Sequence, residues 1–363
     1  MKNPTLHIHA IGLMSGTSCD GLDIAYCEFS RISNNWSYKI LAAKTVDYSV
    51  PFLKKLKEAQ DMQGKDLMLF DREFGAFCGK AVLDFLSETK LPVPEVIGSH
   101  GHTVFHVPAQ GMTCQIGSGA TLYAHTSIPV ASDFRSIDVA LGGQGAPLVP
   151  LGDQLLFSSY DYCLNLGGIS NISYQKDHQL IAFDICPVNM VLNYLSGLLG
   201  MPYDKGGATA ASAKIDDTLL TVLNDLDFYA LPPPKSLGKE WFDHTFLPAL
   251  QSFNHLSVES QLATCTEHMA LKMAEAVKAS GKNNTQRLLA TGGGAFNTHL
   301  MTRFAHHLKG ICTVEIPDPQ TVAFKEALIF ALLGALRLQK EKNVWSSATG
   351  SRRDHCGGAL YGI

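Results

Sequence analysis

The sequence feature that most constrains the fold is a short turn, rich in Gly and hydroxyl residues, between two apolar segments near the N-terminus. Apolar residues fill residues 7–13 and alternate with other residues over 22–29, which is the period of a strand. The turn between them, 15–21, reads SGTSCDG. Such a turn directs several backbone N–H groups and hydroxyls into one small volume, which suits a phosphate.

Asp20 in this turn leaves two interpretations open. A carboxylate repels a phosphate unless a cation lies between them or the carboxylate handles a proton, so one interpretation is a nucleotide site with a divalent metal. The other is an ordinary hairpin in which Gly and Asp only supply turn geometry. Taken alone, the turn favours the hairpin.

The same pattern returns in the middle of the chain. Residues 162–166 and 169–174 predict two strands around the turn Gly167-Gly168, and a third strand at 180–183 ends in Asp184. A chain of 363 residues is long for one core and suggests two domains. Two similar halves facing each other would form a cleft with one phosphate loop from each side.

Composition excludes several classes of protein. The formal charge is −4 and there is no basic block, so we expect no nucleic-acid partner. The N-terminus lacks the usual form of a signal peptide, and no apolar run is long enough to cross a bilayer, so we expect no membrane association. Nine cysteines without a CxxC pair predict free thiols in a reducing cytoplasm.

Several polar segments follow predicted strands. Residues 99–106, SHGHTVFH, are interpreted as a polar loop at the carboxyl end of a strand rather than a metal cluster. Arg135, between Asp133 and Asp138, either forms a local salt bridge or directs its guanidinium at an anionic group of a ligand. The glycine-rich residues 141–147 are typical of a hinge or a domain boundary.

The second half carries similar ambiguities. Asp184, before a helix predicted from Asn189, is either a carboxylate near a helix N-cap or a group beside an anionic ligand. The glycines at 292–294 suit either a flat group such as a nucleotide base or a tight helix–strand crossing. The Pro-rich residues 231–240 are a surface connection or a lid. Glu326, in a helix apolar almost all round (324–338), needs a partner or a function.

Seven segments together resemble the anhydro-N-acetylmuramic acid kinases, in register over nearly the whole chain. They are GLMSGTSCDGLD, SHGHTVFH, SDFRSIDVALGGQGAPLVP, LNLGGISNIS, AFDICPVN, TGGGAFN and KEALIFALLGALR. The resemblance implies an α/β fold with two duplicated actin-like (ribonuclease H-like) domains around a central nucleotide cleft. The expected domains are residues 1–135 plus about 325–363, and residues 136–324.

The resemblance also implies an activity. A kinase of this family uses ATP and Mg²⁺ to open the 1,6-anhydro ring of anhydro-N-acetylmuramic acid with water and to phosphorylate O6. The product is N-acetylmuramic acid 6-phosphate, in peptidoglycan recycling. We therefore expect a small-molecule sugar substrate, a cytoplasmic enzyme and a homodimer.

The family motifs assign roles residue by residue. Asp184 matches the base that takes a proton from water. Asp20 is expected to contact Mg²⁺ through water. The expected ATP and phosphate contacts are Gly16, Thr17, Ser18, Cys19, Asp20, Gly21, Leu22, Asp23, Gly167, Gly168, Gly292, Gly293 and Gly294. The expected sugar contacts are His102, Ser118, Arg135 and Glu326, with Arg135 meeting the lactyl carboxylate.

One departure from the family pattern supports an alternative. The family's Thr-Gly-Pro-Gly after the aspartate is replaced by residues 185–188, ICPV, and Asn193 stands where an acid is expected. Replacing glycines restricts the backbone that positions Asp184. The alternative is a non-catalytic nucleotide- and sugar-binding sensor of the same fold. A kinase for an ordinary hexose is disfavoured by the family-specific segments SHGHT and GGQGAPLVP.

Overall fold

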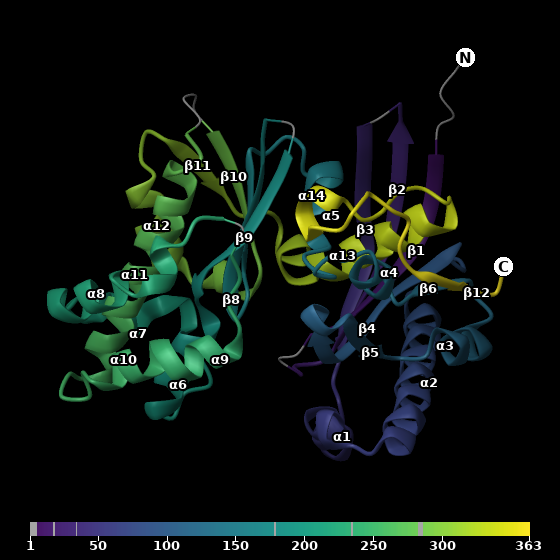
Figure 1. The fold of residues 1–363 in the computed structure, drawn as a ribbon, viewed down its shortest axis with the longest axis horizontal. Helices are drawn as coiled ribbons and strands as arrows, with labels where there is room; N and C mark the ends of the chain where they lie inside the picture. The colour runs from purple at the N-terminus through teal and green to yellow at the C-terminus, as the bar shows by residue number, and fades with distance from the viewer. Residues whose placement is uncertain (1–5, 17–18, 34, 178, 234, 282–285) are drawn as a thin grey trace. The chain divides into compact units, whose positions relative to one another are not determined.

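The computed structural model describes residues 6–16, 19–33, 35–177, 179–233, 235–281 and 286–363. The chain divides into two compact units (Figure 1): unit 1 is Met1–Leu156 with Phe324–Ile363, and unit 2 is Phe157–Ala323. Residues 136–156, which sequence assigned to the second domain, therefore belong to unit 1. The same is true of the glycine-rich residues 141–147. Thr17 and Ser18, two predicted phosphate contacts, lie outside the described residues.

Unit 1 combines a mixed sheet with helices. Its strands are β1 (Leu6–Ser15), β2 (Leu22–Ile32), β3 (Asn35–Val46), β4 (Val96–Val107), β5 (Met112–Ile116), β6 (Val130–Ser132) and β12 (Ala359–Tyr361). Its helices are α1 (Val50–Glu58), α2 (Gly64–Thr89), α3 (Gly119–Thr126), α4 (Ser136–Ala140), α5 (Val149–Leu156), α14 (Ser346–Thr349) and most of α13 (Pro319–Leu338).

The sheet of unit 1 begins with the predicted meander. β1 pairs antiparallel with β2, and β2 pairs antiparallel with β3, which confirms the opening hairpin and the third strand. β4 then runs parallel to β1, and β6 runs parallel to β4. The order is β12-β6-β4-β1-β2-β3, with β5 paired to β4.

Unit 2 also combines a mixed sheet with helices. Its strands are β7 (Tyr162–Leu166), β8 (Ile169–Lys176), β9 (Gln179–Pro187), β10 (Gln286–Thr291) and β11 (Cys312–Glu315). Its helices are α6 (Asn189–Leu198), α7 (Ala208–Ser212), α8 (Asp217–Asn224), α9 (Lys239–Trp241), α10 (Leu247–Gln251), α11 (Val258–Lys278) and α12 (Thr298–His307). Side chains of Ser257 and Asn297 cap the N-termini of α11 and α12.

The sheet of unit 2 has the order β11-β10-β7-β8-β9. β7, β8 and β9 form an antiparallel meander, β10 is parallel to β7, and β11 is parallel to β10. The order β6-β4-β1-β2-β3 in unit 1 has the same directions. This topology is that of the ribonuclease H-like domain, so the predicted duplication and the α/β, actin-like fold class are confirmed.

Helix α13 packs directly on the sheet of unit 1 because two strands carry glycine there. A Cβ atom at Gly12 in β1 would lie 1.7 Å from the carbonyl oxygen of Ala327, and one at Gly98 in β4 would lie 2.0 Å from that of Phe330. Residues 327–333 of the helix are at most 1% exposed, which confirms the buried helix predicted from its apolar composition. Glu326 enters the interior of unit 1 on this helix.

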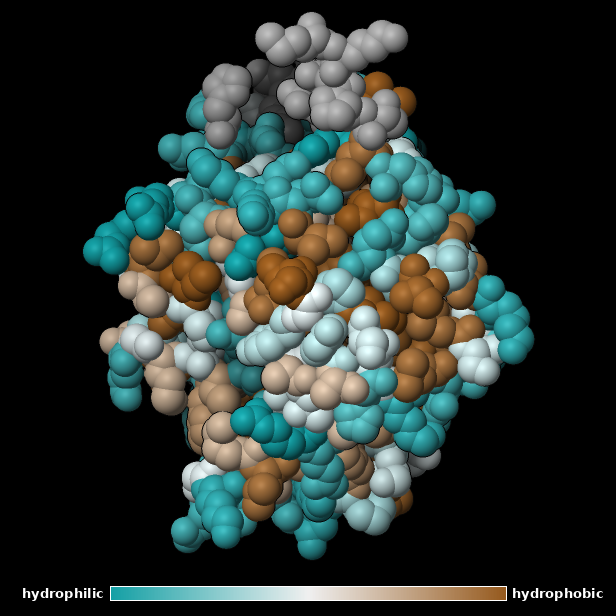
Figure 2. Space-filling model, turned by 90° about the vertical axis from the view of Figure 1, so that its right-hand side faces the viewer, coloured by the Kyte–Doolittle hydropathy of each residue, from teal (hydrophilic) through white to brown (hydrophobic). Residues whose placement is uncertain are grey.

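In the side view of Figure 2, brown hydrophobic residues lie in patches separated by teal and white ones. Among the described residues, no helix combines the length and the apolar character needed to cross a bilayer.

Candidate active site

The predicted phosphate turn of unit 1 connects β1 to β2. Cys19, whose φ is 58°, donates its N–H to the carbonyl of Gly16 at 3.1 Å, so the turn folds back on itself. Gly21 has a φ of 150°, and a Cβ there would meet Thr45 at 2.4 Å. Leu22 is buried and anchors the start of β2. These contacts therefore hold the described residues of the turn, which are 16 and 19–22.

Three carboxylates of unit 1 influence one another. The pKa of Asp23 is raised, chiefly by burial, although Thr45 donates a hydrogen bond to its Oδ1 at 2.6 Å. The pKa of Glu326 is also raised by burial, and the charges of Asp20 and Asp23 raise it further, while those of Lys325 and Arg135 lower it. The charges of Asp20 and Asp23 therefore act on Glu326, and all three side chains carry oxygen donors of the kind that Mg²⁺ prefers. Within the described residues they do not form a closed three-ligand cluster.

His102 lies at the end of a hydrogen-bond chain that the sequence did not reveal. The Tyr48 hydroxyl donates to Ser15 Oγ at 2.7 Å, and Ser15 Oγ lies 2.9 Å from His102 Nδ1. Ser15 has one hydroxyl proton that it can donate to Nδ1, and in that arrangement the neutral imidazole carries its proton on Nε2. Burial lowers the pKa of His102, which favours this neutral form.

Arg135 is held by His100 rather than by its neighbouring aspartates. Its Nη2 and Nε lie 2.8 and 3.2 Å from His100 Nε2, and Nη1 donates to the carbonyl of Gly145 at 2.6 Å. Asp138 instead accepts from the N–H of Gly145 and the hydroxyl of Thr349. Burial lowers the pKa of Arg135 to about 10, so the guanidinium stays charged at neutral pH. The described contacts therefore do not include the local salt bridge weighed from the sequence.

Ser118 has a structural task. Its hydroxyl caps α3 by accepting from the N–H of Thr121 at 3.3 Å, and it also accepts from Arg72 at 3.0 Å. The sugar contact predicted for Ser118 stays a prediction beside this capping role.

Asp184 is the buried acid of unit 2. It lies inside β9, which continues to Pro187, and not at a strand end as predicted, because Cys186 and Pro187 still pair with β8 after a register shift at Ile185. Its Oδ2 accepts the N–H of Leu237 at 2.8 Å, and its N–H donates to the carbonyl of Lys235. Burial raises the pKa of Asp184 to about 6, although the Leu237 hydrogen bond lowers it. A carboxylate of this pKa is suited to general-base chemistry near neutral pH.

The segment that departs from the family pattern is packed into the core of unit 2. Ile185, Cys186 and Val188 are at most 3% exposed. Ser170 Oγ donates to the carbonyl of Cys186 at 3.0 Å, and the N–H of Val188 donates to the carbonyl of Gly168 at 2.8 Å. Apolar burial and backbone hydrogen bonds thus hold this segment.

The second predicted phosphate turn is open to a ligand at one position. A Cβ atom added at Gly167 would find no protein atom closer than 3.5 Å, whereas at Gly168 it would meet Met190 at 3.2 Å. Gly167 and Gly168 both accept hydrogen bonds from the start of α6 through their carbonyls. The turn is therefore tied to this helix N-terminus.

The three glycines after β10 separate into two roles. A Cβ at Gly292, where φ is 81°, would meet Asn165 at 2.6 Å, and one at Gly294 would meet Leu166 at 2.7 Å. One at Gly293 would find only Asn189, at 3.6 Å. The outer two glycines thus serve the tight approach to β7, and the middle one faces open space.

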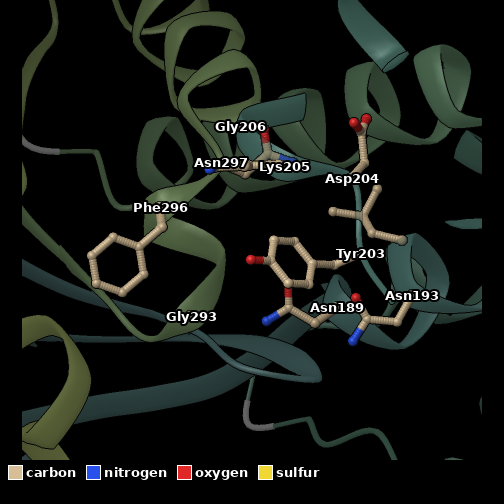
Figure 3. Close-up of a pocket in the computed structure, with 10 residues that line it drawn as sticks. Asn189, Asn193, Tyr203, Asp204, Lys205, Gly206, Gly293, Phe296 and Asn297 are labelled. Carbon is tan, nitrogen blue, oxygen red and sulfur yellow. The ribbon is translucent and has the colours of Figure 1, made fainter. Parts of the chain in front are cut away.

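That space is a pocket of about 450 Å³, within the range of small-molecule sites. Figure 3 shows the rings of Phe296 and Tyr203 on either side of Gly293. Phe296 and Tyr203 are 49% and 58% exposed, unusual for large rings. The lining residues are Asn189, Leu192, Asn193, Tyr203, Asp204, Lys205, Gly206, Gly293, Phe296 and Asn297. Apart from Gly293, none of them was among the predicted contacts.

The structure thus brings some predicted residues together within each unit. In unit 1, Asp20, Asp23, Arg135 and Glu326 interact electrostatically. In unit 2, Gly293 lines the pocket, whereas Gly292 and Gly294 pack against β7. A signal that could have revealed Phe296 was present, because it lies two residues after Gly294, whereas Tyr203 is about 90 residues away in the sequence.

Comparison with known proteins identifies the relatives of the chain. The family model "Anhydro-N-acetylmuramic acid kinase" matches residues 8–362. The kinase of that name from Saccharophagus degradans is 35% identical, over 97% of this chain and 98% of its own length. That from Shewanella amazonensis is 36% identical with the same coverage. A solved structure, component A of the Acidaminococcus fermentans (R)-2-hydroxyglutaryl-CoA dehydratase, aligns with 92% of this chain at 11% identity and a TM-score of 0.47, covering 100% of its own chain.

The family match spans both units and includes every predicted site residue. Identities of 35–36% over nearly the full length of both chains leave no large segment outside the alignment. The chain therefore belongs to the anhydro-N-acetylmuramic acid kinase family.

Proposed function

We propose that this chain is an ATP-dependent kinase that opens the 1,6-anhydro ring of anhydro-N-acetylmuramic acid and phosphorylates O6, giving N-acetylmuramic acid 6-phosphate for peptidoglycan recycling. The observation that carries the proposal is the family match over residues 8–362. It makes the enzyme a phosphotransferase with an alcohol group as acceptor.

Asp184 is proposed as the base of this reaction. With a pKa of about 6, its carboxylate is ionised at neutral pH and accepts a proton from the water that attacks C1. The C1–O6 bond breaks, O6 attacks the γ-phosphorus, and ADP leaves. The N–H of Leu237 fixes the orientation of the carboxylate through Oδ2, so Oδ1 is the oxygen proposed to face the water.

The nucleotide is proposed to place its adenosine in the pocket beside Gly293. The missing side chain at Gly293 and the flanking rings of Phe296 and Tyr203 suit a flat aromatic base. Gly16–Asp23, with Gly167 and Gly168, are the proposed phosphate contacts. Gly292 and Gly294 support Gly293 rather than the ligand.

Mg²⁺ is proposed to accompany ATP. The carboxylate of Asp20, in the predicted phosphate turn, is an oxygen donor suited to this ion and would hold it through water. When bound, the ion neutralises charge on the phosphates.

The sugar is proposed to contact His102, Arg135 and Glu326, with Ser118 as a fourth contact. The Nε2–H of His102 and the charged Arg135 are donors for hydroxyl and carboxylate oxygens, and Glu326 is an acceptor. None of the nine cysteines forms a disulfide, which supports the proposed cytoplasmic location. A homodimer is proposed from the family.

The non-catalytic alternative gains no support from the altered segment 185–188. That segment is buried and hydrogen-bonded, and Asp184 keeps a backbone donor and a pKa suited to a base.

The test is incubation with Mg-ATP and the anhydro sugar, followed by mass spectrometry and ADP detection. We expect one ADP per sugar and a product heavier by one water and one phosphoryl group. Asp184→Asn should make no product and should still bind ATP. A panel of ordinary hexoses is the control, and no turnover of the anhydro sugar by purified enzyme would refute the proposal.

A further inference from the structure

A second group of chemically competent side chains lies on the β1–β2 hairpin, outside the proposed kinase site. His7 and His9 on β1 and Glu28 on β2 project from one face of the sheet, since His9 is the register partner of Glu28. Glu28 Oε2 lies 3.5 Å from His7 Nε2 and 3.5 Å from His9 Nε2. The three ligand atoms all lie within 4.8 Å of one another.

These separations match those of a metal centre. In tetrahedral zinc sites the Zn–N and Zn–O bonds are about 2.1 Å long, so two ligand atoms are about 3.4 Å apart. Both carboxylate–imidazole distances already have this value. The imidazole of His7 is half exposed and has room to turn, so a small side-chain rotation brings the ring nitrogens closer.

A second carboxylate, that of Glu95, lies beside this group of three side chains. Glu95 Oε2 accepts the backbone N–H of His9 at 2.8 Å and lies 3.9 Å from His9 Nδ1, so a second carboxylate lies beside this histidine. Glu28 and Glu95 together balance the charge of a divalent cation held by neutral imidazoles.

Tyr26 provides an independent indication. It lies on the same face of β2 as Glu28, its ring centroid is 5.7 Å from that of His9, and its side chain is fully buried. Its hydroxyl has no hydrogen-bond partner among the residues that the structure describes. Glu28 and Glu95 are the charges that act on this phenol. A buried hydroxyl without a partner indicates a missing water or ion nearby.

We propose that His7, His9 and Glu28 bind one Zn²⁺ ion, with water in the fourth position, at a site separate from the proposed phosphate turn. The site and the turn occupy opposite ends of β1. The six residue steps from His9 to Ser15 span about 20 Å at strand rise. The ion links β1 to β2 and stabilises the hairpin without taking part in phosphoryl transfer.

The test uses the untagged full-length chain, freed of metal with a chelator that is then removed. Titration calorimetry with ZnCl₂ should give one ion per chain, and Zn²⁺ should raise the thermal midpoint. His7→Ala, His9→Ala and Glu28→Gln should each weaken binding about tenfold or more. His255→Ala, an exposed histidine of unit 2, is the matched control and should bind like the unchanged chain.

Cobalt supplies a second readout that does not depend on the stability of the variants. Co²⁺ bound at this site should show visible d–d bands without a thiolate charge-transfer band, because the donors are nitrogen and oxygen. The unchanged protein and the His9→Ala variant should have equal kinase turnover with Mg-ATP. No saturable Zn²⁺ binding, binding retained in the His7→Ala/His9→Ala variant, or a thiolate band would overturn the proposal and leave an ordinary histidine–glutamate pair.

Discussion

Units 1 and 2 share a strand order, yet they hold their polar groups by different means. In unit 1, side chains fix one another: Tyr48 and Ser15 orient His102, and His100 orients Arg135. In unit 2, the backbone does this work: the N–H of Leu237 holds Asp184, and the carbonyls of Gly167 and Gly168 bind the start of α6. One topology thus accepts two ways of building a site, and each should respond differently to substitution.

The largest expected effect lies in unit 2, at Asp184. Asp184→Asn keeps an oxygen that accepts the Leu237 N–H but removes the base, so kcat should fall by about 10²–10⁴. Steady-state assays of ADP release measure this. ATP affinity, measured by calorimetry, should be unchanged, and a variant with normal kcat would exclude Asp184 as the base.

The pH dependence should report the same carboxylate. The pKa of Asp184 is raised to about 6, so the group is protonated below that pH and ionised above it. Activity should therefore be constant above pH 7 and fall about tenfold for each pH unit well below 6. A pH–rate profile of kcat/KM for the sugar tests this. A profile that is flat down to pH 5 would contradict it.

Alanine substitutions at Gly293 and Gly294 should distinguish a glycine that contacts the ligand from one that is needed for packing. Gly294→Ala forces a Cβ to within 2.7 Å of Leu166 and should lower the free energy of unfolding by about 1–3 kcal/mol. Gly293→Ala meets only Asn189 at 3.6 Å, so its stability should be nearly unchanged while KM for ATP rises. Thermal denaturation and ATP kinetics on the two variants form the comparison. Equal effects would contradict the division of roles.

The smallest expected effect lies in the side-chain chain of unit 1. Tyr48→Phe removes a single donor to Ser15 and should cost about 0.5–1.5 kcal/mol of stability. The Ser15 hydroxyl is then free to rotate, so it no longer favours one tautomer of His102. Because His102 is a proposed sugar contact, KM for the sugar should rise more than kcat falls. An unchanged KM would show that the hydrogen bond from Tyr48 to Ser15 has no influence on sugar binding.

The sequence predicted most of what depends on local pattern. Alternating residues around SGTSCDG and around Gly167-Gly168 revealed both meanders, and the apolar composition of 324–338 revealed the buried helix. Contacts between distant residues could not be predicted, because periodicity carries no information on them. Ser15 and His102 are 87 positions apart. Arg135 pairs with His100, 35 positions away, rather than with the aspartates beside it.

The position of Asp184 shows a different limit. Strand β9 continues through Cys186 and Pro187 because the hydroxyl of Ser170 compensates the irregular pairing there. A proline and a change of residue type would ordinarily predict the end of a strand. Likewise, Tyr203 and Phe296 line the same pocket only because the fold brings two segments of unit 2 together.

The contact of α13 with Gly12 and Gly98 has a consequence for protein engineering. At this contact, the backbone of α13 packs directly on the backbone of the strands. No side chain lies between them that could change its rotamer to make room for a larger residue. A methyl group at either glycine would have to displace the helix, and with it Glu326, by more than an ångström. Libraries that aim to alter sugar preference should therefore leave Gly12 and Gly98 constant and vary the residues around His102 and Arg135 instead.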